Sequence, residues 1–300
     1  MSKYTFLVPS YKSSFLREAL RSIKQQTYID FKVIVSDDCS PEDLRSIYNR
    51  EVGDDSRFEF RSNEKNIGSY SLVSHWNLLI ELCKTDYLIM ASDDDVYAPF
   101  FLDEINTQIE RHPDAYLYRS FVNRINEQGD IIERESPIEG YETPLSAMAS
   151  HFKPGRVHCI GNYVFNKDYL LSVGGFVDFP LAWFSDDATI LLCSKNGVCN
   201  TASAAFSFRD SDVNISNDRN VDQKVAVNKI KATKLFYNWS SAFLKGINKP
   251  RDSQEDECYS FLSKKMNERI GWQLRYYYYF LPVMQKIRLL MWMIGNGFKN

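Results

Sequence analysis

The sequence predicts an α/β fold, with a mainly parallel sheet flanked by helices and a C-terminal helical extension. Short apolar runs alternate with longer segments that have helical periodicity, and this alternation predicts the sheet. Polar or acidic residues follow several of the apolar runs, as expected where ligands bind beyond the ends of parallel strands. Beyond about residue 216 the pattern is helical and basic, so we expect one domain at 1–215 and a helical region at 216–300.

Four pairs of strand and helix are expected in the first third of the chain. The first strand, 4–8, ends at Pro9, and apolar residues then recur at helical spacing over 14–26. The second strand precedes a helix that Pro41 opens, with Ser40 as its N-cap. The other strands are expected at 31–36, 58–61 and 87–91, and the other helices at 69–82 and 99–111.

From residue 115 the alternation weakens. A strand is expected at 116–122, and Gly129 with Asp130 forms a hairpin turn before a short strand. Residues 136–156 carry no clear pattern. The last elements expected before the boundary are a strand at 157–165, a helix at 167–173 closed by Gly174 and Gly175, and a helix at 186–195 ended by Asn196 and Gly197.

The most informative segment is 87–99, where an apolar strand leads directly into Asp93, Asp94 and Asp95. Adjacent carboxylates repel one another, so their position at a strand end is best explained by a positive partner, most simply a divalent cation with oxygen ligands. A metal ion that bridges these carboxylates and a diphosphate is the leading hypothesis. The alternative is a solvated acidic turn.

Composition excludes several classes of protein. The chain has 36 Lys and Arg against 39 Asp and Glu, which argues against a dedicated nucleic-acid binder. Its six cysteines are scattered without the spacing of a zinc site, and they indicate a reduced, cytoplasmic compartment. The N-terminus lacks the apolar stretch of a signal peptide, and no window is apolar for the roughly 18 residues that a membrane span needs.

Seven short motifs occur in a specific order and spacing. Together they resemble family 2 glycosyltransferases of the GT-A fold, of the kind that builds bacterial surface polysaccharides, over about the first 215 residues. The resemblance implies an inverting enzyme with a nucleotide-sugar donor, UDP-sugar being favoured, with Mn²⁺ or Mg²⁺ and with a glycan or lipid-linked acceptor. The motifs are Val8-Pro9-Ser10-Tyr11, Gln25-Gln26-Thr27-Tyr28, Asp37-Asp38-Cys39-Ser40, Asn66-Ile67-Gly68, Ser92-Asp93-Asp94-Asp95, Gly174-Gly175-Phe176 and Ser185-Asp186-Asp187.

The resemblance also implies which residues hold the nucleotide. Asp38 would accept a hydrogen bond from the base of a uracil-type nucleotide, and Tyr11 would lie beside that base. The alternative for Asp38 is that it caps the helix beginning at Pro41. The other nucleotide-binding residues implied are Pro9, Asn66, Asp93 near the ribose, and Arg209 at the diphosphate through a bidentate contact.

Two departures from the family pattern affect the metal. The family's Asp-any-Asp signature usually begins where this chain has Ser92, so Asp94 takes the metal-ligand position, and Asp95 is the supporting residue and the rival ligand. Near residue 210 the family has a His where this chain has Ser211. We expect metal dependence, but the further metal or phosphate ligand that the family's His would supply is missing, because Ser211 takes its place.

The same resemblance implies a catalytic base. Asp187 sits where the family keeps the carboxylate that takes the acceptor's proton, with Asp186 beside it. Two adjacent carboxylates raise each other's pKa, although acidic residues in a first helical turn also ordinarily compensate the helix dipole. Trp183 either stacks on the acceptor sugar or packs in the core.

Basic and aromatic residues alternate over 269–298. There are two alternatives for such a segment. It lies on an anionic membrane surface, which would place the protein peripherally on the inner face of the membrane, or it packs on the catalytic core or on a second subunit.

Two other functions stay open. A nucleotidyltransferase usually needs a Gly-rich phosphate loop, which residues 9–14 lack, and a non-catalytic scaffold would tolerate loss of the carboxylates that this chain retains.

Overall fold

The protein is described here by a computed structural model, which covers residues 2–136, 138, 140–212, 221–247 and 252–298. The main sheet has eight strands in the order β3-β2-β1-β4-β10-β6-β11-β9. The strands are β1 (Tyr4–Ser10), β2 (Phe31–Asp37), β3 (Phe58–Ser62), β4 (Tyr87–Met90), β5 (Val96–Tyr97), β6 (Leu117–Arg119), β7 (Val122–Ile125), β8 (Ile131–Arg134), β9 (Tyr141–Glu142), β10 (Tyr163–Asn166), β11 (Val198–Asn200) and β12 (Phe206–Arg209).

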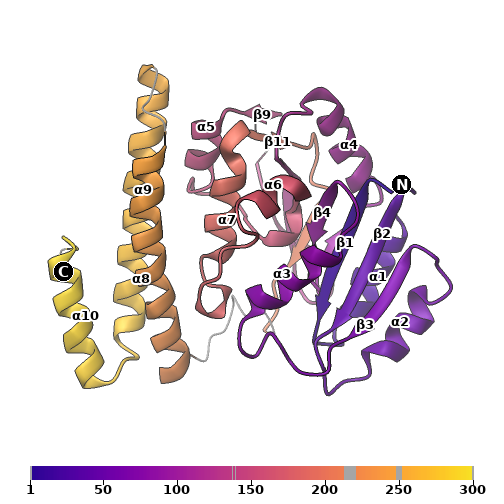
Figure 1. Ribbon diagram of the computed structural model, residues 1–300, viewed down its shortest axis with the longest axis horizontal. Coiled ribbons are helices and arrows are strands. Elements are labelled where there is room, and N and C mark those ends of the chain that lie inside the picture. The colour runs from indigo at the N-terminus through magenta and orange to yellow at the C-terminus, as the bar shows by residue number, and fades with distance from the viewer. Residues whose placement is uncertain (1, 137, 139, 213–220, 248–251, 299–300) are drawn as a thin grey trace.

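Helices flank both faces of this sheet and form a separate layer at one side (Figure 1). Within the described residues, short 3-10 helices lie at Ile160–Asn162, Pro180–Ala182 and Ser194–Asn196. The α-helices are α1 (Leu16–Lys24), α2 (Leu44–Val52), α3 (Leu72–Leu82), α4 (Phe101–Arg111), α5 (Pro144–Ser150), α6 (Lys167–Ser172), α7 (Ser185–Cys193), α8 (Gln223–Gly246), α9 (Ser253–Tyr278) and α10 (Val283–Gly295).

The strand–helix repeats of the first third are confirmed. β1 pairs in parallel with β2 and with β4, and β2 pairs in parallel with β3. The chain therefore moves outward from β1 to β3 and returns to the other side of β1 at β4. In open α/β sheets such a reversal places the ligand-binding crevice beyond the carboxyl ends of the two strands on either side of it, here β1 and β4.

Two local predictions in this part are wrong. Pro9 does not end the first strand, because β1 continues to Ser10 with Pro9 opposite Ser36. β4 ends opposite Leu7, so no neighbouring strand on that side needs the N–H that proline lacks. The second helix begins at Leu44 rather than at Pro41, since the Asp43 carboxylate accepts the Ser46 N–H and caps it.

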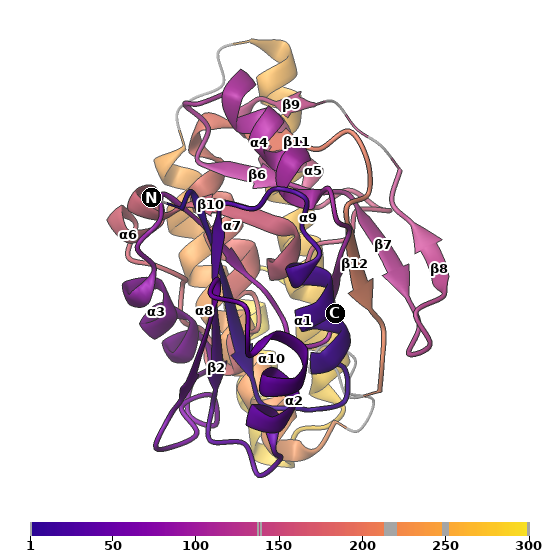
Figure 2. The ribbon, with the colours of Figure 1, turned by 90° about the vertical axis from the view of Figure 1, so that its right-hand side faces the viewer.

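The second half departs further from the expected elements. The strand expected at 116–122 is two strands, β6 in the main sheet and β7 in a second sheet ordered β5-β12-β7-β8 (Figure 2). The hairpin turn is confirmed between β7 and β8, with Gly129 at a φ of 89°. Only the end of the strand expected at 157–165 is β-structure, as β10. Five of the strands and α-helices were not among those expected from the sequence: β5, α5, β9, β11 and β12.

The C-terminal helices pack on the rest of the molecule through a shared core. Buried apolar residues of α8, α9 and α10 meet those of α5 and α7 in one cluster, which includes Phe184, Phe236, Ile270 and Leu289. One face of α9 is therefore core, as one of the two alternatives predicted. The boundary at 215/216 falls among residues 213–220, which lie outside the described residues, and it stays a prediction. Within the described part of the chain, no helix has the length and apolarity to cross a bilayer.

Candidate active site

The crevice between β1 and β4 brings two of the expected nucleotide residues together. Asp93 follows β4, and its Oδ2 accepts the backbone N–H groups of Tyr11 at 2.9 Å and Lys12 at 3.1 Å. Burial raises the pKa of Asp93 above its ordinary value. Asp93 thus joins the carboxyl ends of the two strands, while the Tyr11 ring stays exposed at the crevice.

The two remaining carboxylates of the acidic segment differ in their surroundings. Asp95 is buried, its Oδ1 accepts the Arg209 N–H at 3.0 Å, and its Oδ2 accepts the Ser92 hydroxyl at 2.7 Å. Both oxygens therefore tie β12 and the Ser92 turn to the end of β4. Asp94 is half-buried, and burial together with the charge of Asp93 raises the pKa of its carboxyl to about 6.

A divalent cation fits this arrangement at Asp94. Among the described residues, no group of three or more His, Cys, Asp or Glu side chains is placed to hold a metal ion by itself. Mg²⁺ and similar ions that act on nucleotides need only one or two protein carboxylates, because phosphate oxygens and water complete the coordination. A carboxyl whose pKa is raised by a neighbouring carboxylate also gains most from a positive partner.

Asp38 is held by protein donors. Its carboxylate is buried and accepts hydrogen bonds from Asn63 Nδ2 at 2.8 Å, Ile67 N at 2.9 Å and Gly68 N at 2.7 Å. A Cβ on Gly68 would lie 2.9 Å from Asp38 Oδ2, so this close approach requires glycine. Asn66 belongs to the same loop and accepts the Ser69 N–H. Asp38 therefore organises the loop at this side of the crevice, and its contact with a base stays a prediction.

Arg209 lies beneath the crevice rather than in it. Its side chain is fully buried, its guanidinium pairs with Glu18, and it donates to the backbone oxygens of Asp94, Asn126 and Glu127 at 3.0 to 3.1 Å. A bidentate contact with a diphosphate would require these bonds to break. The structure instead gives Arg209 the role of holding the Asp94 backbone in place.

The second acidic group lies at the start of α7, after a backbone in an unusual conformation. Leu181, Ala182 and Phe184 have φ values of 61°, 54° and 69°, in the left-handed region that non-glycine residues rarely adopt. Such conformations cost of order 1 kcal/mol each and cluster at functional sites. The surrounding packing maintains this one, since the Phe184 ring stacks on Phe236 with 4.3 Å between centroids. The turn directs Asp186 into a cavity.

Asp187 is held between the side chains of His151 and Arg269, which come from distant parts of the chain. Its Oδ1 lies 2.7 Å from Nε2 of His151, which directly follows α5, and 2.7 Å from Nη1 of Arg269 in α9. Burial opposes ionisation of this carboxyl, but the charge of Arg269 and the bond from His151 outweigh it and lower its pKa to about 2. Asp187 is thus a buried carboxylate whose ionised form is favoured by its two partners.

Asp186 has the opposite character. Burial and the negative charge of Asp187 raise the pKa of its carboxyl to about 7. A general base works best when its pKa lies near the operating pH, and a pair of carboxyls with separated pKa values is a common arrangement at catalytic sites. By this criterion Asp186 is a candidate proton acceptor beside Asp187, whose role as the base stays a prediction.

Both carboxyls line a cavity of about 680 Å³, within the range of small-molecule sites. Its other lining residues include Arg156 and His158 from the segment before β10, and Arg269 and Trp272 from α9. Trp183 packs elsewhere, in the core beside Phe184 and Tyr277, and Lys229 lies 4.1 Å from the centre of its ring. Core packing therefore accounts for Trp183, and stacking on an acceptor stays a prediction.

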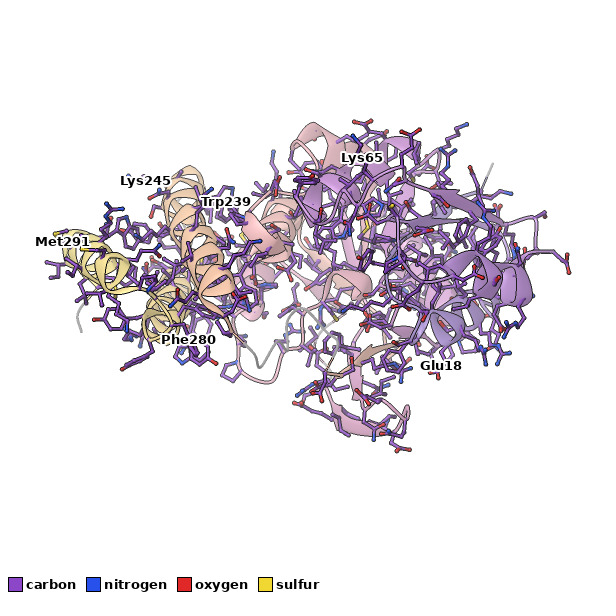
Figure 3. All side chains as sticks on the ribbon, turned by 90° about the horizontal axis from the view of Figure 1, so that it is seen from below. Glu18, Lys65, Trp239, Lys245, Phe280 and Met291 are labelled. Atoms are coloured by element: carbon purple, nitrogen blue, oxygen red, sulfur yellow. The ribbon has the colours of Figure 1, made fainter. Side chains whose placement is uncertain are left out.

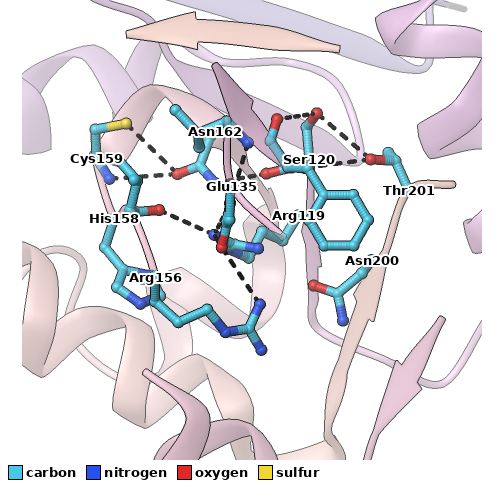
Figure 4. A network of polar contacts seen from close by, with 12 residues as sticks. Arg119, Ser120, Glu135, Arg156, His158, Cys159, Asn162, Asn200 and Thr201 are labelled. Carbon is cyan, nitrogen blue, oxygen red and sulfur yellow. Dashed lines mark hydrogen bonds and ion pairs between the residues drawn. The ribbon is translucent and has the colours of Figure 1, made fainter. Parts of the chain in front are cut away.

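A buried polar network fixes the wall of this cavity (Figure 4). Arg119 donates to both oxygens of Glu135 at 2.6 and 2.8 Å and to the Val157 carbonyl at 2.9 Å. Arg156 donates to both oxygens of Glu142 at 2.9 and 3.0 Å. No sequence pattern identified these residues, because the partners come from separate strands and loops.

The ion pair between Arg269 and Asp187 gives a testable prediction. Arg269→Gln is expected to lower the free energy of unfolding at pH 7 by about 1–2 kcal/mol, because it leaves a buried carboxylate without its charged partner, although Arg269 is itself 41% exposed. The lowered pKa of Asp187 stabilises the fold above the unfolded pKa of about 4, and this contribution is lost as the pH falls towards 2. The difference from wild type should therefore shrink below pH 4 in urea unfolding experiments.

Lys264→Gln on the same helix is the matched control. Lys264 pairs with Glu268 at 3.9 Å on the exposed side, so its loss should change stability by less than about 0.5 kcal/mol. Equal effects of the two substitutions would contradict the role assigned to Arg269.

Comparison with known proteins identifies the family to which the chain belongs. A family model for glycosyl transferase family 2 matches residues 5–171, more than half of the chain. An uncharacterized glycosyltransferase of Methanocaldococcus jannaschii is 28% identical over 124 residues, which are 41% of this chain and 42% of that protein. One of Haemophilus influenzae is 28% identical over 178 residues, 57% of this chain and 55% of that protein. The chain thus spans about half the length of the curated relatives that it matches.

Solved structures share the fold. S. aureus TarS 1–349 in complex with UDP-GlcNAc gives a TM-score of 0.65 at 13% identity, over 93% of this chain and 82% of that one. The mannosyltransferase PcManGT from Pyrobaculum calidifontis, in complex with GDP-Man and Mn²⁺, gives 0.58 at 14% identity, over 92% and 72%. At these identities the likeness shows the fold alone, and the predicted GT-A fold is confirmed.

Proposed function

The chain belongs to glycosyl transferase family 2, and from this premise we propose that it transfers a sugar from a nucleotide-diphosphate sugar to a hydroxyl group, with inversion at the anomeric carbon. The observation that carries the proposal is the pair Asp186 and Asp187 in one cavity, where burial and the charge of Asp187 raise the pKa of Asp186 while Arg269 and His151 lower the pKa of Asp187. This pair supplies both an available base and a fixed negative charge.

In the proposed reaction Asp186 accepts the proton of the acceptor hydroxyl. The hydroxyl oxygen then forms a bond to the anomeric carbon, and the bond from that carbon to the diphosphate oxygen breaks, releasing the nucleoside diphosphate. Asp187 stays ionised beside Arg269 and keeps the pKa of Asp186 high through its charge. Inversion follows from a single displacement at the anomeric carbon.

The donor is proposed to bind at the crevice beyond β1 and β4. Tyr11 and Pro9 would lie at the base, Asp93 near the ribose, and Asp94 would hold Mn²⁺ or Mg²⁺, with Asp95 supporting it. When bound, the ion would neutralise charge on the leaving diphosphate. UDP is the favoured nucleotide, and the solved relatives were crystallised with UDP-GlcNAc in one case and GDP-Man with Mn²⁺ in another.

The acceptor is proposed to be a hydroxyl of a glycan or of a lipid-linked sugar, used in the synthesis of a cell-surface polysaccharide. The cavity at Asp186 is large enough for one or two sugar rings. Trp272 at its edge offers an aromatic face, the kind of surface on which a sugar ring packs.

Calorimetric titration with UDP, GDP and dTDP, each with and without Mn²⁺, tests the donor assignment. One of the three nucleotides is expected to bind, and EDTA should weaken that binding because the diphosphate needs the ion held by Asp94. If none binds to the folded protein, the donor site is wrong, and the scaffold alternative replaces the enzyme.

A further inference from the structure

The outer side of the C-terminal helices carries an unusual concentration of exposed apolar side chains. Among the residues that the structure describes, nine of the twenty large apolar side chains that are exposed lie between Trp272 and Ile294. We call them the outer apolar surface: Trp272, Tyr276, Tyr279 and Phe280 at the end of α9, and Val283, Met284, Ile287, Met291 and Ile294 on α10.

The spacing of these residues gives each helix one apolar face in addition to its core face. Trp272, Tyr276 and Tyr279 recur at intervals of four and three, as do Ile287, Met291 and Ile294. The opposite face of α10 holds the buried residues Leu289 and Met293. Figure 3 shows Phe280 and Met291 on the outside of the helical layer, at the end of the molecule remote from the sheet. Contiguous apolar surface of this kind usually marks an interaction site.

The charged residues of the segment that carries this surface are all basic, and the first acidic residue before it is Glu268, one turn from Trp272 at the cavity. Residues 269–298 contain Arg269, Arg275, Lys286 and Arg288 and no Asp or Glu. Arg269 is used inside the cavity by Asp187, whereas Arg275 and Arg288 are exposed and Lys286 is half-buried near the Tyr278 ring. An apolar face with aromatic residues and mostly basic neighbours is complementary to an anionic lipid surface, with apolar side chains at the acyl boundary and cations at the phosphates.

The outer apolar surface is continuous with the cavity. Trp272 lines the cavity that contains Asp186, and its ring stacks on Tyr276 with 5.2 Å between centroids. Tyr276 in turn contacts Phe280, at 5.7 Å between centroids. A row of aromatic rings therefore leads from the edge of the cavity to the end of α9.

From these observations we propose that the outer apolar surface of α9 and α10 docks on the surface of an anionic lipid bilayer. The cavity at Asp186 then opens close to the membrane, so that an acceptor sugar attached to a lipid reaches the base while its apolar chain stays in the bilayer. This last consequence rests on the proposed function, whereas the docking itself does not.

A second copy of the chain is the main competing occupant. The two faces of a symmetric dimer are the same patch, and like charges that meet across an interface are costly. Here that patch would bring its like charges Arg275, Lys286 and Arg288 towards those of the other copy. Charge therefore favours the lipid over the dimer.

Sedimentation of the full chain with vesicles tests the proposal. Binding is expected to vesicles of phosphatidylcholine with phosphatidylglycerol, to fall with added salt, and to be much weaker to phosphatidylcholine alone. Ile287→Glu with Met291→Glu should lower the partition coefficient at least about tenfold, because both charges would enter the apolar boundary. Lys286→Gln and Arg288→Gln should each lower it about fivefold on anionic vesicles.

Phe100→Glu is the matched control, since Phe100 is exposed directly before α4, which lies at the opposite end of the molecule from α10 (Figure 1), and this change should leave vesicle binding unchanged. Equal binding by wild type and the Ile287/Met291 variant, or no binding to anionic vesicles, would overturn the proposal. So would self-association of the lipid-free protein that the same two substitutions abolish. Nucleotide binding, measured in parallel on every variant, reports separately on the proposed function and on folding.

Discussion

Asp186→Asn is expected to lower kcat/KM for sugar transfer by about 10²–10⁴-fold while leaving nucleotide binding nearly unchanged, because it removes the proposed proton acceptor and leaves the crevice at β1 and β4 intact. Transfer rates with the nucleotide sugar identified by calorimetry would measure the loss. Normal turnover in this variant would remove Asp186 as the base.

The pH dependence separates the two candidate bases. If Asp186 takes the proton, kcat/KM of the wild type should rise with pH and level off above about 7, where its carboxyl is ionised. If Asp187 takes it, the profile should be flat across this range, since its pKa is about 2. We expect the rising profile.

Asp187→Asn provides the complementary variant. It is expected to lose activity as well, because Arg269 and His151 lose the carboxylate that they hold. Its residual activity should level off at a lower pH than in the wild type, since the charge that raises the pKa of Asp186 is gone. An unshifted profile would contradict the coupling between the two carboxyls.

Folding of Asp186→Asn can be checked through stability. The raised pKa means that Asp186 releases its proton at a higher pH in the folded protein than in the unfolded chain. The folded state therefore binds more protons between about pH 4 and 7, and wild-type stability falls as the pH rises from about 4 to 7. The Asn variant cannot ionise, and relative to wild type it should gain stability at pH 8 compared with pH 5. Loss of activity together with this gain would exclude misfolding as the cause.

Asp94→Asn is expected to weaken Mn²⁺-dependent nucleotide binding at least about tenfold. Asp94 is the half-buried carboxyl whose pKa of about 6 reflects its burial and its repulsion by Asp93, and a bound cation would relieve that repulsion. Changes even in the outer shell of a metal site commonly cost 10–100-fold in affinity, so loss of a direct ligand should cost at least as much. Titration of the nucleotide with and without Mn²⁺ measures the effect.

Asp95→Asn distinguishes the metal ligand from its neighbour. Because Asp95 is bonded to the Arg209 N–H and the Ser92 hydroxyl, its change should lower thermal stability, whereas Asp94→Asn should not. Metal-dependent binding that survives in Asp94→Asn and disappears in Asp95→Asn would reverse the assignment.

The order of elements in the first third of the chain could be predicted because local patterns carry it. Each strand is a short buried run, each helix has apolar residues at a spacing of three or four, and Asp93 to Asp95 follow a strand end that lies at the crevice. The motif order indicated the family, which the family model over residues 5–171 confirms.

The partners of the site residues could not be predicted in the same way. The sequence around Arg209 does not show whether its guanidinium contacts a diphosphate or a protein carboxylate. In the structure it pairs with Glu18, which lies 191 positions away. Asp186 and Asp187 are adjacent residues of the same type, yet their pKa values shift in opposite directions. Arg269, 82 positions after Asp187, lowers the pKa of Asp187, whereas burial and the negative charge of Asp187 raise the pKa of Asp186.

The sequence by itself therefore determined the α/β order of the first four strands, the acidic crevice and the family. Only the tertiary structure decided that α9 completes the cavity, that Asp95 and Arg209 are held by protein partners, and that one face of the C-terminal helices is core while the other is exposed. The physical reason is that periodicity reports burial along one element, whereas ion pairs and cavity walls depend on which distant elements pack together.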